Sequence, residues 1–201
     1  VEGYMDAISL HAHGVTNVVA SLGTAFTVEQ ARLLKKYADE IVFSYDMDAA
    51  GQNATRRALE IAGAVGLKLR VALVGEGKDP DEFVNLHGGE AYLEAVAQAQ
   101  PALDYLFGAL QRQYDASTLD GQHHILDEMF AVLLAQQDTF QFNSFIRKIA
   151  MTLHMDEGMI RSEALSFAKK NHSTLYISQK TPLEAPTTDN GPQAKKQKLL
   201  E

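Results

Sequence analysis

The stretch from residue 41 to residue 51 constrains the fold most. An apolar run, 41–45, ends in two carboxylates, Asp46 and Asp48, and a helical pattern begins at Ala49. The β-branched and aromatic residues of the run 41–45 predict a strand buried on both faces. In open α/β sheets, ligands bind beyond the carboxyl ends of such strands. The two carboxylates repel by about 1 kcal/mol at 4 Å in water and about 4 kcal/mol at an effective dielectric of 20. A divalent cation would remove this penalty. The alternative is that one aspartate caps the following helix.

Strands and helices alternate over the first part of the chain. Strands are predicted at 1–2, 17–21, 41–45 and 67–74, with helices at 4–13, from Thr27 onward and at 50–65. This order predicts an α/β fold with a parallel, Rossmann-like sheet and right-handed crossovers. Amphipathic helices follow, at roughly 90–99, 102–113, 118–136, 139–153 and 156–169. The predicted organisation is an α/β subdomain at 1–100 whose first strand is truncated, an α-helical bundle subdomain at 101–170 and a flexible linker at 171–201.

Capping residues mark several helix starts. Thr27 with Gln30 fits a capping box, and Asp79 followed by Pro80 is typical of a helix N-terminus. Thr118 and Asp138 are also acceptable N-caps. These positions mark where the predicted helices begin.

Composition limits the chemistry available to the chain. With 201 residues and no cysteine, it has no disulfide, zinc ribbon or thiol nucleophile, so a metal would need oxygen or imidazole ligands, which points to magnesium or manganese. The net charge of −8 predicts weak binding to DNA by the chain alone. No apolar run approaches the roughly 20 residues of a membrane span, so the expectation is a soluble, cytoplasmic protein. Because the chain opens with Val1 in the middle of a motif, we expect a fragment of a longer protein.

Acidic residues follow three of the predicted strands. They are Glu2, the pair Asp46 and Asp48, and the pair Asp79 and Asp81. Parallel strands align their carboxyl ends, so these clusters are expected at one edge of the sheet, where carboxylates suit magnesium. Glu2 is alternatively a general acid or base, and Asp79 and Asp81 are also explained by stabilisation of a helix N-terminus.

Other candidates have plain structural explanations. The turn Ser21, Leu22, Gly23 and Thr24 offers backbone amides to a phosphate, or is a simple connection. The paired histidines, at 11 and 13 and at 123 and 124, diverge on their helices and are expected at the surface. Lysines 35 and 36 and arginines 56 and 57 are expected on solvated helix surfaces.

Four of these motifs, in this order, resemble the Toprim region of bacterial DnaG-type primases. They are residues 1–6 (VEGYMD), 20–25 (ASLGTA), 45–51 (YDMDAAG) and 78–82 (KDPDE). The resemblance covers residues 1–110 well, and the helices to about 170 are similar to the helical subdomain that completes the primase polymerase core. It implies a Toprim fold.

The resemblance implies an enzyme that synthesises short RNA primers on a DNA template for replication, by metal-dependent nucleotidyl transfer. Glu2, Asp46 and Asp48 match catalytic positions that bind magnesium, and Asp79 and Asp81 match further metal-binding positions. Asp6 matches another acidic position of that site, and the turn 21–24 matches a loop beside it. One metal would lower the pKa of the primer 3′-hydroxyl, and another would stabilise the departing pyrophosphate.

The resemblance also implies partners that act through the intact protein. These are the single-stranded DNA template, nucleoside triphosphates and a replicative helicase, which primases bind through a domain after the linker. Zinc is expected only in an N-terminal domain outside this chain, and Met47 stands where the family often has glycine. Two alternatives stay open: another Toprim enzyme, such as a nuclease or topoisomerase fragment, and a non-catalytic module that recruits a helicase.

Overall fold

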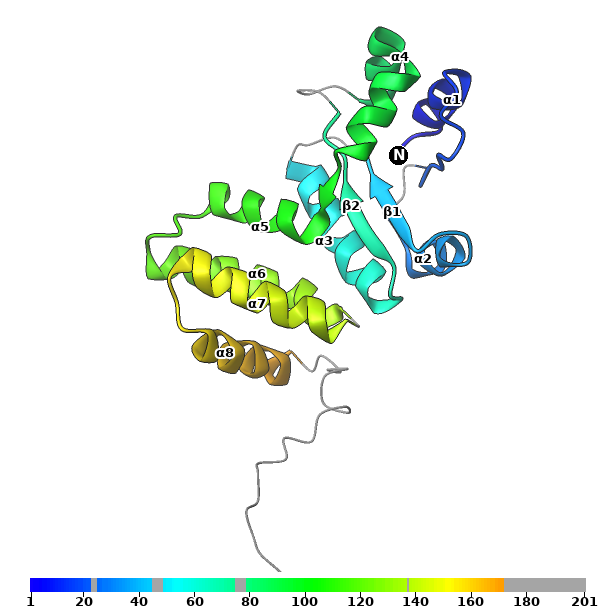
Figure 1. Cartoon of the computed structure of the whole chain (residues 1–201). Helices are drawn as coiled ribbons and strands as arrows, with labels where there is room; N and C mark the ends of the chain where they lie inside the picture. Colours follow the sequence, from blue (N-terminus) through cyan, green and yellow to red (C-terminus); the bar gives the residue numbers. More distant parts are fainter. Residues whose placement is uncertain (23–24, 45–48, 75–78, 137, 172–201) are drawn as a thin grey trace, which may run out of the picture.

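The computed structural model describes residues 1–22, 25–44, 49–74, 79–136 and 138–171. A small sheet lies between a pair of helices at one end of the molecule and a stack of helices on the other side (Figure 1). The elements are, in order, α1 (Tyr4–Ala12), α2 (Val28–Lys35), β1 (Glu40–Phe43), α3 (Ala49–Ala64), β2 (Lys68–Val71), α4 (Pro80–Ala97), β3 (Gln100–Pro101), α5 (Ala102–Gln113), α6 (Leu119–Ala135), α7 (Thr139–Leu153) and α8 (Glu157–Lys170).

The sheet has the order β1-β2-β3 and is mixed rather than wholly parallel. β1 and β2 are parallel, with Glu40 opposite Lys68, whereas β3 is antiparallel to β2, with Gln100 opposite Val71. The sequence prediction missed β3 because two residues, one of them Pro101, give no alternating pattern. Arg70 holds this strand in place, since its Nε donates to the carbonyl oxygen of Ala99 over 2.8 Å.

Two predicted strands, 1–2 and 17–21, do not form regular strands. The Val1 amino group donates to the Val19 carbonyl over 3.0 Å, and the Ser21 amide donates to the Val1 carbonyl over 3.1 Å. The two segments therefore run side by side, but too few hydrogen bonds join them for a ladder. The predicted strand 67–74 is also shorter than expected, because β2 ends at Val71.

The predicted caps are confirmed. The Thr27 hydroxyl accepts from the Gln30 amide over 3.2 Å, and the Gln30 side chain accepts from the Thr27 amide over 2.9 Å. Asp79 accepts from the Glu82 amide over 2.7 Å. Thr118 and Asp138 likewise accept amides of α6 and α7. These side chains satisfy amides that have no partner inside the helix.

α4 consists of two helical parts, in agreement with the prediction of separate helices before and after about residue 90. They meet at a kink at Gly88, which is not helical and whose φ of 82° lies in the region that favours glycine. The next residue, Gly89, packs against the end of α1: a Cβ there would lie 2.1 Å from the His13 carbonyl oxygen. α1 and α4 lie side by side in Figure 1.

Buried apolar residues form two separate clusters in the described ranges. The larger contains residues of β1, β2, α3 and α5 to α8, with Ile125, Met129 and Phe130 among the most buried. The smaller consists of Leu10, Val15, Val74, Val84 and Tyr92, and it joins α1 to α4. The chain therefore has one core for the helical stack and a second at the acidic end of the sheet.

The helical stack follows the predicted pattern closely, since α5 to α8 begin and end within one residue of the predicted bounds. Gln136 is buried, and its Nε2 donates to the carbonyl oxygens of Val132 and Leu59, which ties α6 to α3. Within the described helices, none combines the length and apolar character that crossing a membrane requires. The predicted linker 171–201 lies, apart from Asn171, outside the described residues.

Candidate functional site

The candidate site lies where β1 and β2 end, below α1 and α4 (Figure 1). Four of the residues that the sequence assigns to it lie outside the described residues: Asp46, Asp48, Gly23 and Thr24. The others are placed by the structure, and each has its own local environment.

Glu2 lies beside the first residue of the predicted phosphate-binding turn. The Ser21 hydroxyl donates to the Glu2 carbonyl oxygen over 3.4 Å, so the two segments are in contact. Ser21 is buried, whereas the side chains of Glu2 and Leu22 are exposed. The structure therefore presents the Glu2 carboxylate to solvent at the edge where the turn begins.

Asp6 closes the first turn of α1. Its Oδ2 accepts a hydrogen bond from the Gly3 amide over 2.9 Å. Burial lowers the pKa of the Val1 amino group, while the nearby carboxylates of Asp6 and Glu2 act in the opposite direction. Both carboxylates thus lie near the same amino group.

Asp81 joins α4 to α1. The Ser9 hydroxyl of α1 donates to Asp81 Oδ1, and the Asn85 Nδ2 donates to the same oxygen over 3.0 Å. Asp79 is the N-cap of α4. Capping therefore accounts for Asp79, in line with the alternative explanation given by the sequence, whereas Asp81 makes a contact between the two helices.

Tyr92 lies beside the candidate site, and the sequence analysis did not single it out. It is buried in the smaller core, and burial, followed by the charge of Asp6, raises the pKa of its phenol. The Ser44 hydroxyl acts in the opposite direction and lies near the phenol, although outside regular hydrogen-bond geometry. Tyr92 therefore lies between Asp6 of α1 and the residue that follows β1, two positions before Asp46. Only its position as a large aromatic in a helical pattern marks it in the sequence.

The described residues alone do not form a metal centre. Across these ranges, no three His, Asp or Glu side chains are close enough to hold an ion. Glu2 and Asp6 supply oxygen donors at the end of the sheet, which is the donor type that magnesium and manganese prefer. This donor set fits a divalent cation. Asp46 and Asp48, the other predicted ligands, lie outside the described residues.

The histidines of α6 are surface residues, as expected. His123 lies 3.6 Å from Asp127 and His124 lies 3.7 Å from Asp120, each one helical turn apart. The His124 ring also stacks on Tyr114, with 5.0 Å between the ring centroids. These contacts explain the histidines without a metal.

Comparison with known proteins identifies the first part of the chain. Residues 1–84 match the Toprim-like family. DNA primase of Clostridium acetobutylicum is 40% identical over 167 residues, which cover 82% of this chain and 27% of the primase. The chain therefore spans about a quarter of the length of this curated relative.

Solved structures agree with the sequence match. A DNA primase domain from Pseudomonas aeruginosa has a TM-score of 0.72 and 32% identity, covering 82% of this chain and 52% of that domain. A DnaG primase catalytic domain bound to single-stranded DNA has a TM-score of 0.70 and 32% identity, covering 79% and 51%. The fold is therefore a Toprim α/β fold followed by a helical subdomain, as predicted. The chain is homologous to part of the bacterial DnaG-type DNA primases.

Proposed function

We propose that this chain provides the metal-binding catalytic part of a bacterial primase, which synthesises short RNA primers on a single-stranded DNA template by nucleotidyl transfer. The relatives are named DNA primase, and one solved catalytic domain is bound to single-stranded DNA. The single observation that carries the proposal is that two of the matched acidic residues and the matched turn meet: the Ser21 hydroxyl binds the Glu2 carbonyl oxygen, and the neighbouring Gly3 amide binds Asp6.

The proposed metal ligands are Glu2, Asp46 and Asp48, with Asp79 and Asp81 nearby. Magnesium is the proposed ion, with manganese as a substitute, because the donors are all oxygens. When bound, such ions lower the pKa of an attacking hydroxyl and neutralise charge that develops on a phosphoryl group.

Three contacts of described side chains position this edge of the sheet. Asp81 binds the Ser9 hydroxyl and so fixes α1, which carries Asp6, against α4. Tyr92 fills the space between α1 and the end of β1. The Ser21 hydroxyl binds the Glu2 carbonyl oxygen, so the loop that we propose to contact the phosphates of a nucleotide begins beside Glu2.

Calorimetric titration with magnesium and manganese tests the metal site. We expect saturable binding to the chain, and loss of that binding in the Asp46→Asn/Asp48→Asn variant, because amides cannot supply the charge that holds the ion. The control is Asp120→Asn/Asp127→Asn, which removes two carboxylates from α6, on the helical stack.

The outcomes separate the explanations. Binding lost in the site variant and kept in the control supports the proposal. Equal binding in both variants, or no binding to a chain whose circular dichroism shows a fold, would overturn it and leave the aspartates as helix caps.

A further inference from the structure

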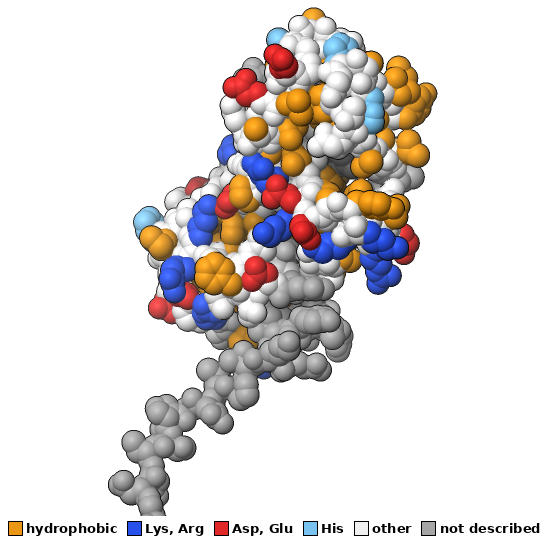
Figure 2. Space-filling model, turned by 45° about the vertical axis from the view of Figure 1, so that its right-hand side comes forward, with side chains coloured by type: hydrophobic (Ala, Val, Ile, Leu, Met, Phe, Trp, Pro, Cys, Tyr) orange, Lys and Arg blue, Asp and Glu red, His pale blue; other side chains and the backbone are white. Residues whose placement is uncertain are grey.

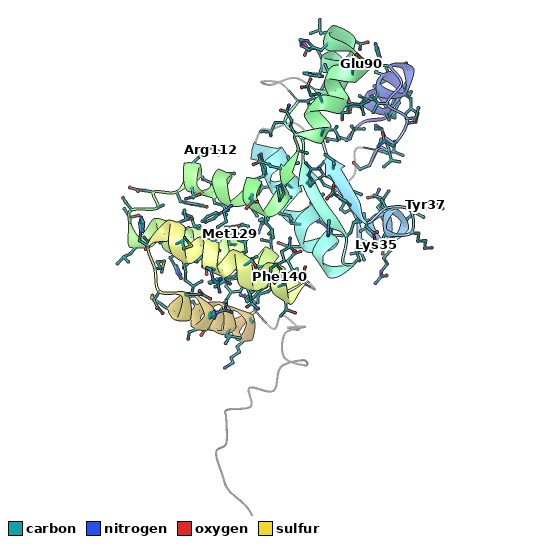
Figure 3. The ribbon with its side chains drawn as sticks, in the orientation of Figure 1. Lys35, Tyr37, Glu90, Arg112, Met129 and Phe140 are labelled. Atoms are coloured by element: carbon teal, nitrogen blue, oxygen red, sulfur yellow. The ribbon has the colours of Figure 1, made fainter. Side chains whose placement is uncertain are left out.

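A group of basic side chains surrounds the end of α2, away from the acidic site. It consists of Arg32, Lys35, Lys36 and Lys68, and we call it the basic patch. The three residues of α2 and its C-cap are spaced three and four positions apart, so they share one face of the helix. Figure 2 shows Lys and Arg side chains gathered on the flank of the molecule that α2 occupies, and Figure 3 shows Lys35 and Tyr37 there.

Lys68 belongs to the same patch although it comes from β2. Its amide donates to the Asp39 carbonyl oxygen over 3.0 Å, which places it next to the loop after α2. The Lys35 ammonium, by a hydrogen bond, and then Lys68, by its charge, both contribute to lowering the pKa of the exposed Asp39 carboxyl. The two lysines therefore flank one carboxylate.

The positive charge of the patch is incompletely neutralised. Lys35 pairs with Asp39 over 2.7 Å, but within the described part of the chain no carboxylate lies within 4.0 Å of Arg32, Lys36 or Lys68. Several basic residues elsewhere have such partners: Arg56 lies 3.2 Å from Glu128 and Lys148 lies 2.6 Å from Asp104. In a chain with a net charge of −8, three unpaired cations in one place mark a surface that attracts an anion.

An exposed aromatic side chain completes the patch. Tyr37 follows Lys36 directly, and 82% of its surface is accessible to solvent. Exposed aromatics next to cations are typical of surfaces that bind single-stranded nucleic acid, because bases stack on the ring while the cations contact phosphates. Neither a free phosphate nor a poly-acidic peptide carries a base that would stack on the Tyr37 ring.

The patch lies at the opposite end of the sheet from the acidic site. Lys68 faces Glu40 at the first positions of β2 and β1, whereas the acidic residues follow the last positions. Four strand residues span about 13 Å, so one flexible strand of nucleic acid can reach both ends. We propose that the basic patch and Tyr37 form a second contact for single-stranded nucleic acid, in addition to the proposed active site.

Fluorescence anisotropy with a labelled single-stranded oligonucleotide, measured in EDTA over a range of salt concentrations, tests this contact. The Lys36→Gln/Lys68→Gln variant should bind more weakly. Its plot of log K against log salt should be less steep, with the negative slope smaller in magnitude by about 1.4, since each phosphate contact on a single strand contributes about 0.7. The matched control is Lys169→Gln/Lys170→Gln, which removes two exposed charges from the end of α8.

Tyr37→Leu tests stacking separately. It should weaken binding about 5- to 150-fold, which corresponds to 1–3 kcal/mol per stacked base, and leave the salt slope unchanged. Identical binding by the Lys36/Lys68 variant and its control would overturn the contact. Equal competition by poly-glutamate, with no effect of Tyr37→Leu, would overturn its assignment to nucleic acid. Because EDTA removes divalent ions, these results do not depend on whether the proposed metal site exists.

Discussion

At the scale of single residues, the acidic end of the sheet depends on groups that the sequence motifs do not contain. Tyr92 comes from α4, Asp6 from α1 and Ser44 from the end of β1, yet the electrostatic effects on the phenol place all three together. Ser44 is only 2% exposed, and its hydroxyl finds no partner in regular geometry among the described residues. The site is therefore held by a buried aromatic ring and by close packing more than by paired polar groups.

The raised pKa of Tyr92 predicts an alkaline limit to stability. The unfolded phenol ionises near its ordinary pKa of 10.0, whereas burial and Asp6 keep the folded phenol neutral to higher pH. Its contribution to the free energy of unfolding is fully present below pH 10 and is lost as the pH rises through the raised, folded value.

Tyr92→Phe should therefore make the free energy of unfolding, measured with urea, depend less on pH above 10. Part of the dependence should remain, because burial also raises the pKa of Tyr105. An unchanged pH dependence in the variant would show that Tyr92 ionises equally easily in both states.

At the scale of elements, the contact between α1 and α4 positions the site, and it depends on Gly89. Gly89→Ala should destabilise the protein by about 1–3 kcal/mol, because its Cβ would overlap a backbone oxygen that cannot move without separating the helices. Urea unfolding measures the effect.

Gly108→Ala is the matched control, in the interior of α5. The added Cβ would lie 3.5 Å from its nearest contact, the end of the Arg112 side chain, so the change should be neutral or stabilising by up to about 1 kcal/mol through helix propensity. Equal effects of the two substitutions would mean that the α1–α4 contact is not close-packed.

Sequence reasoning predicted some of these elements and not others, for physical reasons. α6, α7 and α8 were predicted well because apolar residues repeat with the helical period and Thr118, Asp138 and Asp156 cap the first turns. β3 could not be predicted, since it depends on a contact with β2, which is distant in the sequence. At the site, the carboxylates could be proposed from sequence motifs, whereas Tyr92 is recognised only from its burial in the structure.

At the scale of the whole molecule, the two hydrophobic clusters predict unequal local stability. α1 contributes one buried residue, Leu10, whereas α6 contributes eight. Segments with few buried apolar contacts open at lower free energy. The half of the molecule that carries Glu2 and Asp6 should therefore open more readily than the helical stack.

Native-state hydrogen exchange followed by mass spectrometry measures this difference. Amides of α1 should exchange faster than amides of α6, and Gly89→Ala should increase exchange in α1 and α4 while leaving α6 unchanged. Similar protection of α1 and α6 would show that the molecule unfolds as a single cooperative unit.

The short strand β3 has a consequence for how copies of this protein meet one another. Exposed strand edges invite further strands to add, which leads to aggregation. In the described part of the sheet, β3 forms one edge; it has only two residues, and Pro101, opposite Arg70, has no amide hydrogen to donate. A strand from another molecule would find too few donors there, so the sheet does not extend to a second molecule at this edge.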